Sequence, residues 1–225
     1  MDAEGFLFVV FWSMMKKRRG YMIKISHKKQ KNDGYNWKCG AACLEMIFEY
    51  FKIVRTQDDI WNEIKSMRPG SLTQFYACTH DVIRYAIKNG ICATGYKAKE
   101  STCRNVLEEL DKEKIPAILL VKEQKTNQSH FIVYIGIKNK LYYYCDPNSS
   151  KDFNYMKQID LERSWSPDQQ FGIPGYVLIV FDKKMDSIIQ CANCGSTVQI
   201  VQGILQDQME SVICPYCGQT AILYS

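Results

Sequence analysis

The stretch Trp37-Lys-Cys-Gly-Ala-Ala-Cys-Leu44 is the most informative part of this 225-residue chain. It places Cys39 where a helix over residues 40–51 is expected to begin, because apolar side chains follow at helical spacing. These apolar positions are Leu44, Ile47, Phe48 and Phe51. A thiol attacks only as its thiolate, and the positive end of a helix or a neighbouring imidazolium lowers its pKa. Cys39 is therefore a candidate nucleophile, although a cysteine taken alone is more commonly a buried core residue.

A histidine and an aspartate downstream supply the other parts of a thiol-based catalytic set. His130 opens an apolar strand predicted over residues 129–137, and Asp146 follows a strand predicted over residues 141–145. Residues 138–140 indicate a short hairpin turn, so the two strands would be adjacent and antiparallel, with His130 facing Asp146. We expect the carboxylate to accept a hydrogen bond from Nδ1–H of the histidine and so to fix its tautomer. A lone histidine is more often structural, and Asp-Pro commonly starts a turn, so the combination carries the argument.

Helical patterns dominate the first half of the chain and strand patterns the second, which predicts the α+β class. Thr79 and Ser101 are the expected N-caps of two helices. Residues 147–173 show no regular pattern, and residues 183–190 are predicted to be a linker. The other expected helices cover residues 58–67, 79–88 and 102–112, and the other expected strands cover residues 21–26, 116–122 and 175–181.

The order and spacing of these motifs resemble the bacteriocin-processing, double-glycine leader peptidases, which are papain-like cysteine peptidases. The shared pattern is a glutamine, then Cys-Gly, then His-Phe-x-Val-x-x-Gly at residues 130–136, then Asp-Pro at residues 146–147. The resemblance covers roughly residues 22–182. It implies a papain-like fold with N-terminal helices and an antiparallel sheet, and it implies peptide cleavage, usually after Gly-Gly.

The resemblance also implies a role for each of four residues. Cys39 would be the nucleophile, His130 the general base and acid, and Asp146 the residue that orients the histidine. Gln30 would donate its side-chain amide to the oxyanion hole, together with the backbone N–H of Cys39. The family's glutamine often lies closer to the cysteine, at the position that Asp33 occupies here, so the alternative for Gln30 is an ordinary solvated loop residue. Lys38, just before the nucleophile, also departs from the acidic or polar residue common in the family.

The implied chemistry is attack by the Cys39 thiolate on an amide or thioester carbonyl, followed by an acyl-enzyme. Water would release the acyl group in a cysteine peptidase, whereas an amine would accept it in an acyltransferase or amidase. A further alternative is a catalytically inactive domain that binds a peptide and serves as an adaptor. The sequence leaves these three possibilities open.

Two Cys-x-x-Cys pairs near the end of the chain predict a zinc site. Each pair is followed by a glycine, which relieves backbone crowding at the tight turn. Four thiolates form a closed tetrahedral site, so the metal would be structural and not catalytic. A rubredoxin-like iron site and a redox pair are the alternatives. The expected ligands are Cys191, Cys194, Cys214 and Cys217, within a zinc ribbon over residues 188–225.

The distribution of charge argues against nucleic acid as a partner. The formal net charge is +5, but residues 1–31 hold eight Lys and Arg against two acidic residues. Residues 191–225 hold no Lys or Arg at all. Affinity for nucleic acid depends largely on basic side chains that neutralise phosphates, so the ribbon is a poor phosphate binder. We expect a peptide or protein substrate, with the ribbon docking to a protein partner or to the peptidase domain.

The N-terminal residues 1–21 form a separate, basic and apolar extension. The apolar run over residues 6–15 is shorter than the about 20 residues that a membrane span needs. The basic residues follow this run, which is the reverse of a secretory signal. We expect an extension outside the fold, or a start at Met15 or Met22, and no membrane partner; the alternative is a weak interfacial anchor through residues 6–19. The ten cysteines group as metal ligands, a nucleophile and scattered apolar-flanked thiols, which favours a reducing compartment, the cytoplasm.

Overall fold

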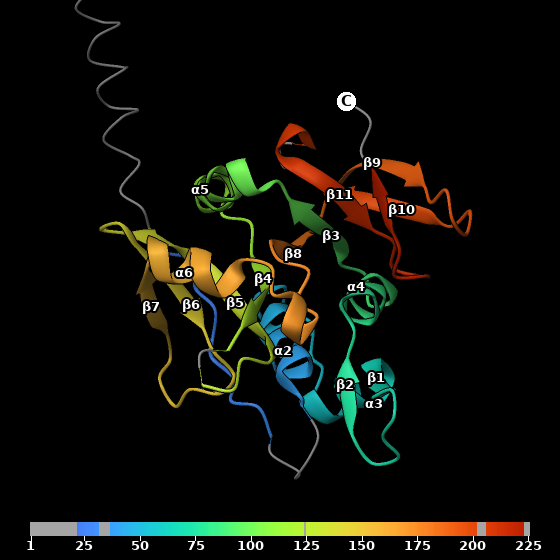
Figure 1. Cartoon of the computed structure of the whole chain (residues 1–225), viewed down its shortest axis with the longest axis horizontal. Coiled ribbons are helices and arrows are strands. Elements are labelled where there is room, and N and C mark those ends of the chain that lie inside the picture. The colour runs from blue at the N-terminus through green and yellow to red at the C-terminus, as the bar shows by residue number, and fades with distance from the viewer. Residues whose placement is uncertain (1–21, 32–36, 124, 202–205, 223–225) are drawn as a thin grey trace, which may run out of the picture.

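An eight-stranded antiparallel sheet forms the centre of the molecule (Figure 1). The computed structural model describes residues 22–31, 37–123, 125–201 and 206–222. The strand order is β12-β11-β3-β8-β4-β5-β6-β7. The bounds are β3 Cys92–Ala98, β4 Ala117–Lys122, β5 Ser129–Lys138, β6 Leu141–Cys145, β7 Asn154–Lys157, β8 Val177–Asp182, β11 Met209–Ile213 and β12 Thr220–Ile222.

Helices and two short ribbons cover the sheet. The two-stranded ribbons pair β1 (Lys65–Met67) with β2 (Phe75–Ala77), and β9 (Met185–Gln190) with β10 (Thr197–Val201). The helices are α2 (Cys39–Tyr50), α3 (Gln57–Ile64), α4 (Thr79–Lys88), α5 (Cys103–Glu113) and α6 (Gln158–Trp165), and three 3-10 turns cover residues 100–102, 169–171 and 206–208.

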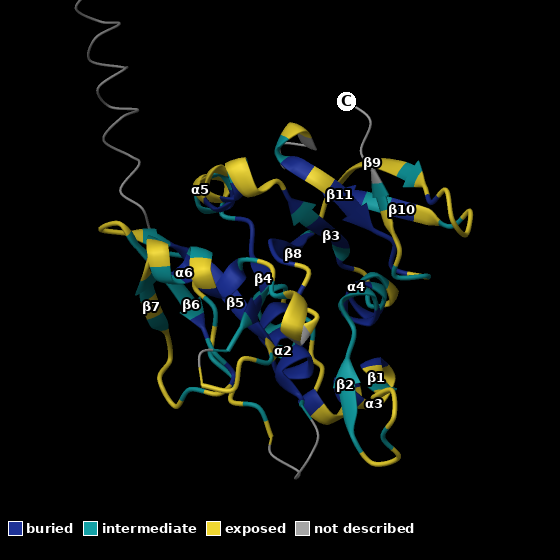
Figure 2. Cartoon of the chain, viewed as in Figure 1, coloured by how far each residue is buried: buried dark blue, intermediate teal, exposed yellow. Residues whose placement is uncertain are grey.

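The sheet separates two hydrophobic cores. Along β5, the side chains of Phe131 and Val133 belong to the core shared with α2, α3 and α4, whereas those of Ile132 and Tyr134 belong to the core shared with α5, α6 and β10. Both faces of the central strands are therefore buried (Figure 2). Strands buried on both faces have nearly continuous apolar sequences, which explains the long apolar runs in this half of the chain.

A β-bulge in β5 separates the start of this strand from its turn. The register with β6 shifts between Tyr134 and Gly136, so that Val133 pairs with Cys145. Gly136 has a φ of 129°, and a Cβ there would lie 2.5 Å from Oδ1 of Asp111. Only glycine fits this conformation and this space. The bulge thus fixes the register that brings the start of β5 beside the segment after β6.

Helix α2 is the most buried helix of the fold. Nine of its twelve residues are buried, because it lies between β5 and the other two helices of its core. Gly40 permits close packing in the first turn: a Cβ at this position would come within 3.0 Å of the Cβ of Ala77 and 3.3 Å of the ring of Phe131. The helix start is thereby pressed against β2 and β5, which fixes the position of Cys39.

The α+β class predicted from the sequence is confirmed, as are the hairpin of β5 and β6 and the buried helix after Cys39. The helix predicted over residues 58–67 is wrong at its end, because Lys65 leaves the helix and residues 65–67 pair with β2. The predicted N-caps are also wrong. Cys78, whose backbone is extended, precedes α4, and Ser101 lies in a 3-10 turn before α5.

Three further segments differ from the prediction. Residues 147–173 contain β7, which pairs with the edge of β6, and α6. The predicted linker over residues 183–190 contains β9, which pairs with β10. The described part of the expected strand 21–26 is not a strand, although Ile23 donates one backbone hydrogen bond to the carbonyl of Ile135 at 2.8 Å. In each case the structure of the segment depends on its contacts with a distant part of the chain, which a local sequence pattern does not show.

The C-terminal part of the chain continues the central sheet. Strand β11 pairs with β3 through Val212 and Tyr96, and β12 then forms the edge. On one face of β3, the hydroxyl of Thr94 donates to the carbonyl of Gln199 at 2.8 Å and accepts from the backbone N–H of Val201 at 2.9 Å. The predicted ribbon therefore shares a hydrogen-bonded sheet and a hydrophobic core with the rest of the fold.

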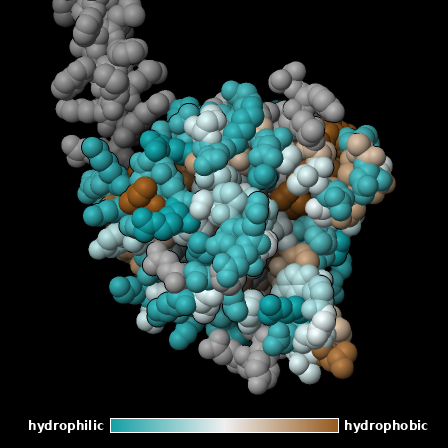
Figure 3. Space-filling view, in the orientation of Figure 1, coloured by the Kyte–Doolittle hydropathy of each residue, from teal (hydrophilic) through white to brown (hydrophobic). Residues whose placement is uncertain are grey.

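The surface seen in Figure 3 is mainly hydrophilic, and hydrophobic residues occur on it in small, separate groups. No helix of the described segments combines the length and the apolar character needed to cross a membrane. The expectations for residues 1–21 and for Asp33 fall outside the described residues.

Candidate active site

Cys39, His130 and Asp146 come together from three elements. Cys39 is the first residue of α2, His130 is the second residue of β5, and Asp146 follows the last residue of β6. Nε2 of His130 lies 2.8 Å from Oδ1 of Asp146. The expected contact through Nδ1 is therefore wrong, because the ring presents its other nitrogen to the carboxylate. This orientation leaves Nδ1 for the thiol of Cys39, which lines the same cleft and whose interaction with the ring raises the pKa of His130.

Asp146 is held through both its side chain and its backbone. The backbone N–H of Asn148 donates to the same Oδ1 at 2.8 Å. The ring of His27 contacts the Asp146 carbonyl oxygen at 2.8 Å through its Nε2. His130 is only 6% exposed, so its ring is fixed by packing as well as by the hydrogen bond. These contacts fix the position of Asp146, and its carboxylate in turn orients the histidine.

The environment of Cys39 favours the thiolate. Burial acts to raise the pKa of its thiol, since the charged form loses hydration. The hydrogen bond and the charge of His130 outweigh that effect, with help from the backbone amides of Phe131 and Gly40, so the pKa lies below its ordinary value. Cys43, one helical turn away, has the opposite balance: burial raises the pKa of its thiol, and its Sγ donates to the Phe131 carbonyl at 3.3 Å.

The histidine and the aspartate show the matching shifts. Burial acts to lower the pKa of His130, but its interactions with Asp146, which accepts a hydrogen bond from the ring, and with Cys39 raise it well above its usual range. Burial likewise acts to raise the pKa of Asp146, yet His130 and the Asn148 amide hold it below its ordinary value. The three pKa shifts thus act in the same direction, since each favours the charged form of its group, as a thiolate–imidazolium pair beside a carboxylate requires.

Gln30 lies at the same site. It lines a polar cleft of about 200 Å³ together with Cys39 and His130. Its Oε1 is buried and makes no hydrogen bond among the described residues. Its backbone N–H donates to the carbonyl of Pro147 at 2.9 Å, which ties it to the segment after Asp146.

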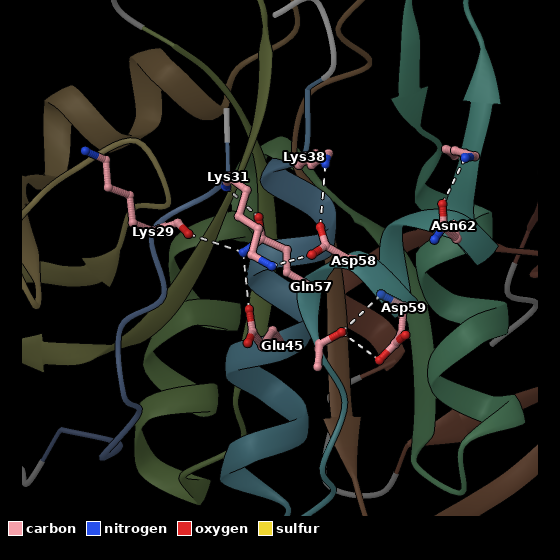
Figure 4. A network of polar contacts seen from close by, with 10 residues as sticks. Lys29, Lys31, Lys38, Glu45, Gln57, Asp58, Asp59 and Asn62 are labelled. Atoms are coloured by element: carbon pink, nitrogen blue, oxygen red, sulfur yellow. Dashed lines mark hydrogen bonds and ion pairs between the residues drawn. The ribbon is translucent and has the colours of Figure 1, made fainter. Parts of the chain in front are cut away.

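A buried side chain from α3 holds the segment on both sides of Gln30 (Figure 4). Gln57 is 2% exposed. Its Oε1 accepts from the backbone N–H of Lys31 at 2.6 Å, and its Nε2 donates to the carbonyl of Lys29 and to Glu45, each at 3.2 Å. Because these contacts flank the glutamine, Gln57 is a positioning residue for it. Sequence reasoning missed Gln57, since a glutamine at a helix start has no distinctive pattern.

A second, larger cleft begins at Cys39 and runs in another direction. It has a volume of about 370 Å³ and its lining is mostly apolar. It shares Trp37, Cys39 and Ser129 with the polar cleft. Of these two clefts, the polar one is lined by His130 and the apolar one is not. Cys39 therefore stands where a polar cleft and an apolar cleft meet.

The four predicted metal ligands form one cluster. The Sγ atoms of Cys191, Cys194, Cys214 and Cys217 all lie within 4.8 Å of one another. Two of the separations are 3.8 Å, between Cys191 and Cys217, and 3.7 Å, between Cys194 and Cys214. A tetrahedral zinc–thiolate site has edges of about 3.8 Å, so the cluster fits a metal ion.

Comparison with known proteins assigns the chain to a family. Residues 22–172 match the Peptidase_C39 like family, which is more than half of the chain. The protein thus belongs to the Peptidase_C39 like family and is a cysteine peptidase. No curated protein gives a match.

Comparison with solved structures shows a shared fold. The peptidase domain of Streptococcus ComA, a bi-functional ABC transporter involved in quorum sensing, is 18% identical, with a TM-score of 0.54 over 71% of this chain and 98% of that one. A Bacillus anthracis protein described as a C39-like peptidase is 17% identical, with a TM-score of 0.54 over 72% and 98%. A double glycine motif protease from an AMS/PCAT transporter, crystallised with its leader peptide, is 24% identical over 73% and 94%, with a TM-score of 0.49.

Alkylation of Cys39 should reveal the lowered pKa of its thiol. With iodoacetamide between about pH 5 and about pH 9, we expect single-site labelling that persists below neutral pH, because the thiolate is lost only as the pH falls through the lowered pKa. In His130→Ala, burial remains while the stabilising charge is lost, so labelling at about pH 6 should slow at least about tenfold. Intact mass measures the rate, with Cys39→Ala as the control. Equal rates in His130→Ala and wild type would contradict the ion pair.

Replacement of Gln57 should weaken turnover through Gln30. We expect Gln57→Ala to lower kcat on a peptide amide by about tenfold or more, while iodoacetamide labelling stays unchanged because alkylation needs no oxyanion hole. Asn62→Ala, on the exposed side of the same helix, is the matched control.

A double-mutant cycle separates positioning from general destabilisation. If Gln57 acts through Gln30, adding Gln57→Ala to Gln30→Ala should cost little more than Gln30→Ala alone. Fully additive losses in kcat would show that Gln57 acts elsewhere.

Proposed function

We propose that the protein cleaves peptide bonds with Cys39 as nucleophile, His130 as general acid and base, and Asp146 as the residue that orients the histidine. The main support is the position of the His130 ring, whose Nε2 lies 2.8 Å from Oδ1 of Asp146 and which lines the same cleft as Cys39. Membership of a cysteine peptidase family supports the same assignment.

The first half of the reaction forms an acyl-enzyme. The Cys39 thiolate attacks the carbonyl carbon, and the π electrons move to oxygen to give a tetrahedral oxyanion. The side-chain amide of Gln30 and the backbone N–H of Cys39 would donate to that oxygen. As the intermediate collapses, the C–N bond breaks and the His130 imidazolium gives its proton to the leaving nitrogen, so the amine departs neutral.

The second half regenerates the enzyme. Neutral His130 takes a proton from water while the water oxygen attacks the thioester carbon. The second tetrahedral intermediate then expels the Cys39 thiolate, which restores the ion pair with the imidazolium. If an amine took the place of water, the same steps would give acyl transfer. The identity of the acceptor is thus the difference between the peptidase and its nearest alternative.

The proposed substrate is a peptide or protein with Gly-Gly before the cleaved bond. This part of the proposal rests on the resemblance to double-glycine leader peptidases. The proposed location is the cytoplasm, where a reducing environment would keep both the nucleophile and a thiolate cluster reduced.

We also propose that Cys191, Cys194, Cys214 and Cys217 bind one structural zinc ion. With four protein thiolates the coordination shell is complete, so the metal would stabilise the fold and would leave no position for substrate. The cluster joins the turn after β9 to the turn between β11 and β12. Zinc would therefore fix these two turns relative to each other, and with them the outer end of the sheet.

Cleavage of fluorogenic peptides tests the proposed reaction. A peptide with Gly-Gly before the reporter should be cleaved by wild type, should be inert to Cys39→Ala, and should lose about 10²–10³-fold in kcat with Gln30→Ala. Mass spectrometry of the product identifies the acceptor. A product that appears only when an amine is added would support acyl transfer instead. Peptide binding without any product would favour the inactive adaptor.

Metal analysis tests the proposed zinc site. Protein purified without chelator should contain about one zinc per chain, and Cys214→Ser should lose the metal and melt at a lower temperature, because metal binding contributes to folding. Cys92→Ser, outside the cluster, is the control. Equal metal content in both variants would refute the assignment of these ligands.

A further inference from the structure

The apolar cleft that begins at Cys39 ends at the second cysteine turn. Its far wall includes Ile213, Gly218 and Thr220, which flank and follow the pair Cys214 and Cys217. These residues lie well beyond residues 22–172, the part that matches the peptidase family. The second cysteine turn, residues 214–220, is thus a wall of the cleft that this chain adds to the family fold.

Several contacts hold the second cysteine turn against the catalytic part of the molecule. Nη1 of Arg84 donates to the carbonyl of Pro215 at 3.4 Å. His80 lies directly against Gly218, since a Cβ at this glycine would come within 2.9 Å of the histidine Nδ1. Both side chains belong to α4, which follows directly on Ala77 and Cys78 of the cleft lining. The turn is therefore packed in place at the cleft and is not a separate appendage.

The chemistry of the reaction decides which half of a peptide faces this wall. His130 must reach the leaving nitrogen to protonate it, so the leaving half of the substrate lies along the polar cleft that His130 lines. The acyl half, which stays bonded to Cys39, then extends the other way. The apolar cleft is the cavity on that side, and it shares the nucleophile with the polar one.

We propose that the second cysteine turn binds the acyl half of the substrate peptide, at residues several positions before the cleaved bond. Ile213 and the methyl group of Thr220 would contact apolar side chains there, opposite Leu120 and Phe131. The inference rests on the proposed peptidase function. It makes the cysteine turn a determinant of specificity, because a short acyl half would not reach it.

The shape of this wall depends on the four thiolates. Cys214 N donates to the carbonyl of Gln219 at 2.9 Å and the N–H of Gly218 donates to the Cys214 carbonyl at 3.0 Å, so the turn is closed by its own backbone. The cysteine cluster then holds it to the turn after β9. A metal bound there would contribute to substrate binding without taking part in bond cleavage.

Peptide aldehydes of two lengths test the inference. One ends in Gly-Gly-aldehyde with an acetyl group before the glycines, and the other carries about four additional apolar residues before them. The variants are Thr220→Trp, which places an indole in the cleft, and Gln219→Trp, a matched control at an exposed neighbour that does not line it. Inhibition constants are measured on the full chain with its metal retained, and iodoacetamide labelling of Cys39 is measured alongside.

We expect the long aldehyde to bind wild type more tightly than the short one, and Thr220→Trp to weaken the long aldehyde by about tenfold. The short aldehyde and the labelling rate should change less than about twofold, and Gln219→Trp should behave as wild type. Slower hydrogen exchange in residues 214–220 with the long aldehyde bound would be the independent sign of contact.

Two results would overturn the inference while leaving the peptidase intact. In the first, the long aldehyde binds wild type no more tightly than the short one. In the second, Thr220→Trp and Gln219→Trp change the inhibition constants of the two aldehydes by the same factor. Failure of the proposed function would look different: wild type would bind neither aldehyde, and Cys39 would show no preferential labelling.

Discussion

The burial of three titratable groups in a row is the constraint on which the site depends. Each of Cys39, His130 and Asp146 loses hydration on burial, and its neighbours in the row, together with nearby backbone amides, shift its pKa toward the charged form. An unpaired charge at such a buried position is strongly unfavourable, so the charged form of each group depends on the presence of the others. Its members come from the start of a helix, the start of a strand and the end of the neighbouring strand. The fold must therefore fix three separate segments to within hydrogen-bond distance, and the packing of α2 against the sheet does this.

Much of this arrangement was predictable because it depends on short-range patterns. The hairpin of β5 and β6 follows from two apolar runs and a short turn, and that pairing alone brings His130 near Asp146. The ring nitrogen that faces the carboxylate was predicted wrongly, since it depends on the side-chain orientation and not on strand pairing. Gln30 lies at the site, but its position is held by Gln57 on a distant helix, which no local pattern indicates.

The elements that the sequence did not predict are those that depend on neighbours. Strand β3 contains Gly95 and two alanines and has weak strand preference. It forms because β8 and β11 pair with its two sides, and small residues suit it because Ile83 and Ile213 approach closely. The two cysteine pairs predicted a ribbon by themselves, whereas the residues of β9 were predicted to be a linker. The continuous sheet that joins this part to the peptidase depends on pairing between segments that are distant in the sequence.

The continuous sheet also matters for shortened forms of the protein. A chain that stopped at residue 182 would keep the candidate catalytic residues, but β3 would become an edge strand, because residues 95–98 would lose their pairing with β11. Tyr96, now fully buried, would lose the part of its hydrophobic core that Val198 and Ile200 supply. Long apolar edges recruit strands from other molecules, so such a chain would tend to self-associate. In the full chain β11 and the short β12 occupy that edge, and the C-terminal part thus also protects the sheet against aggregation.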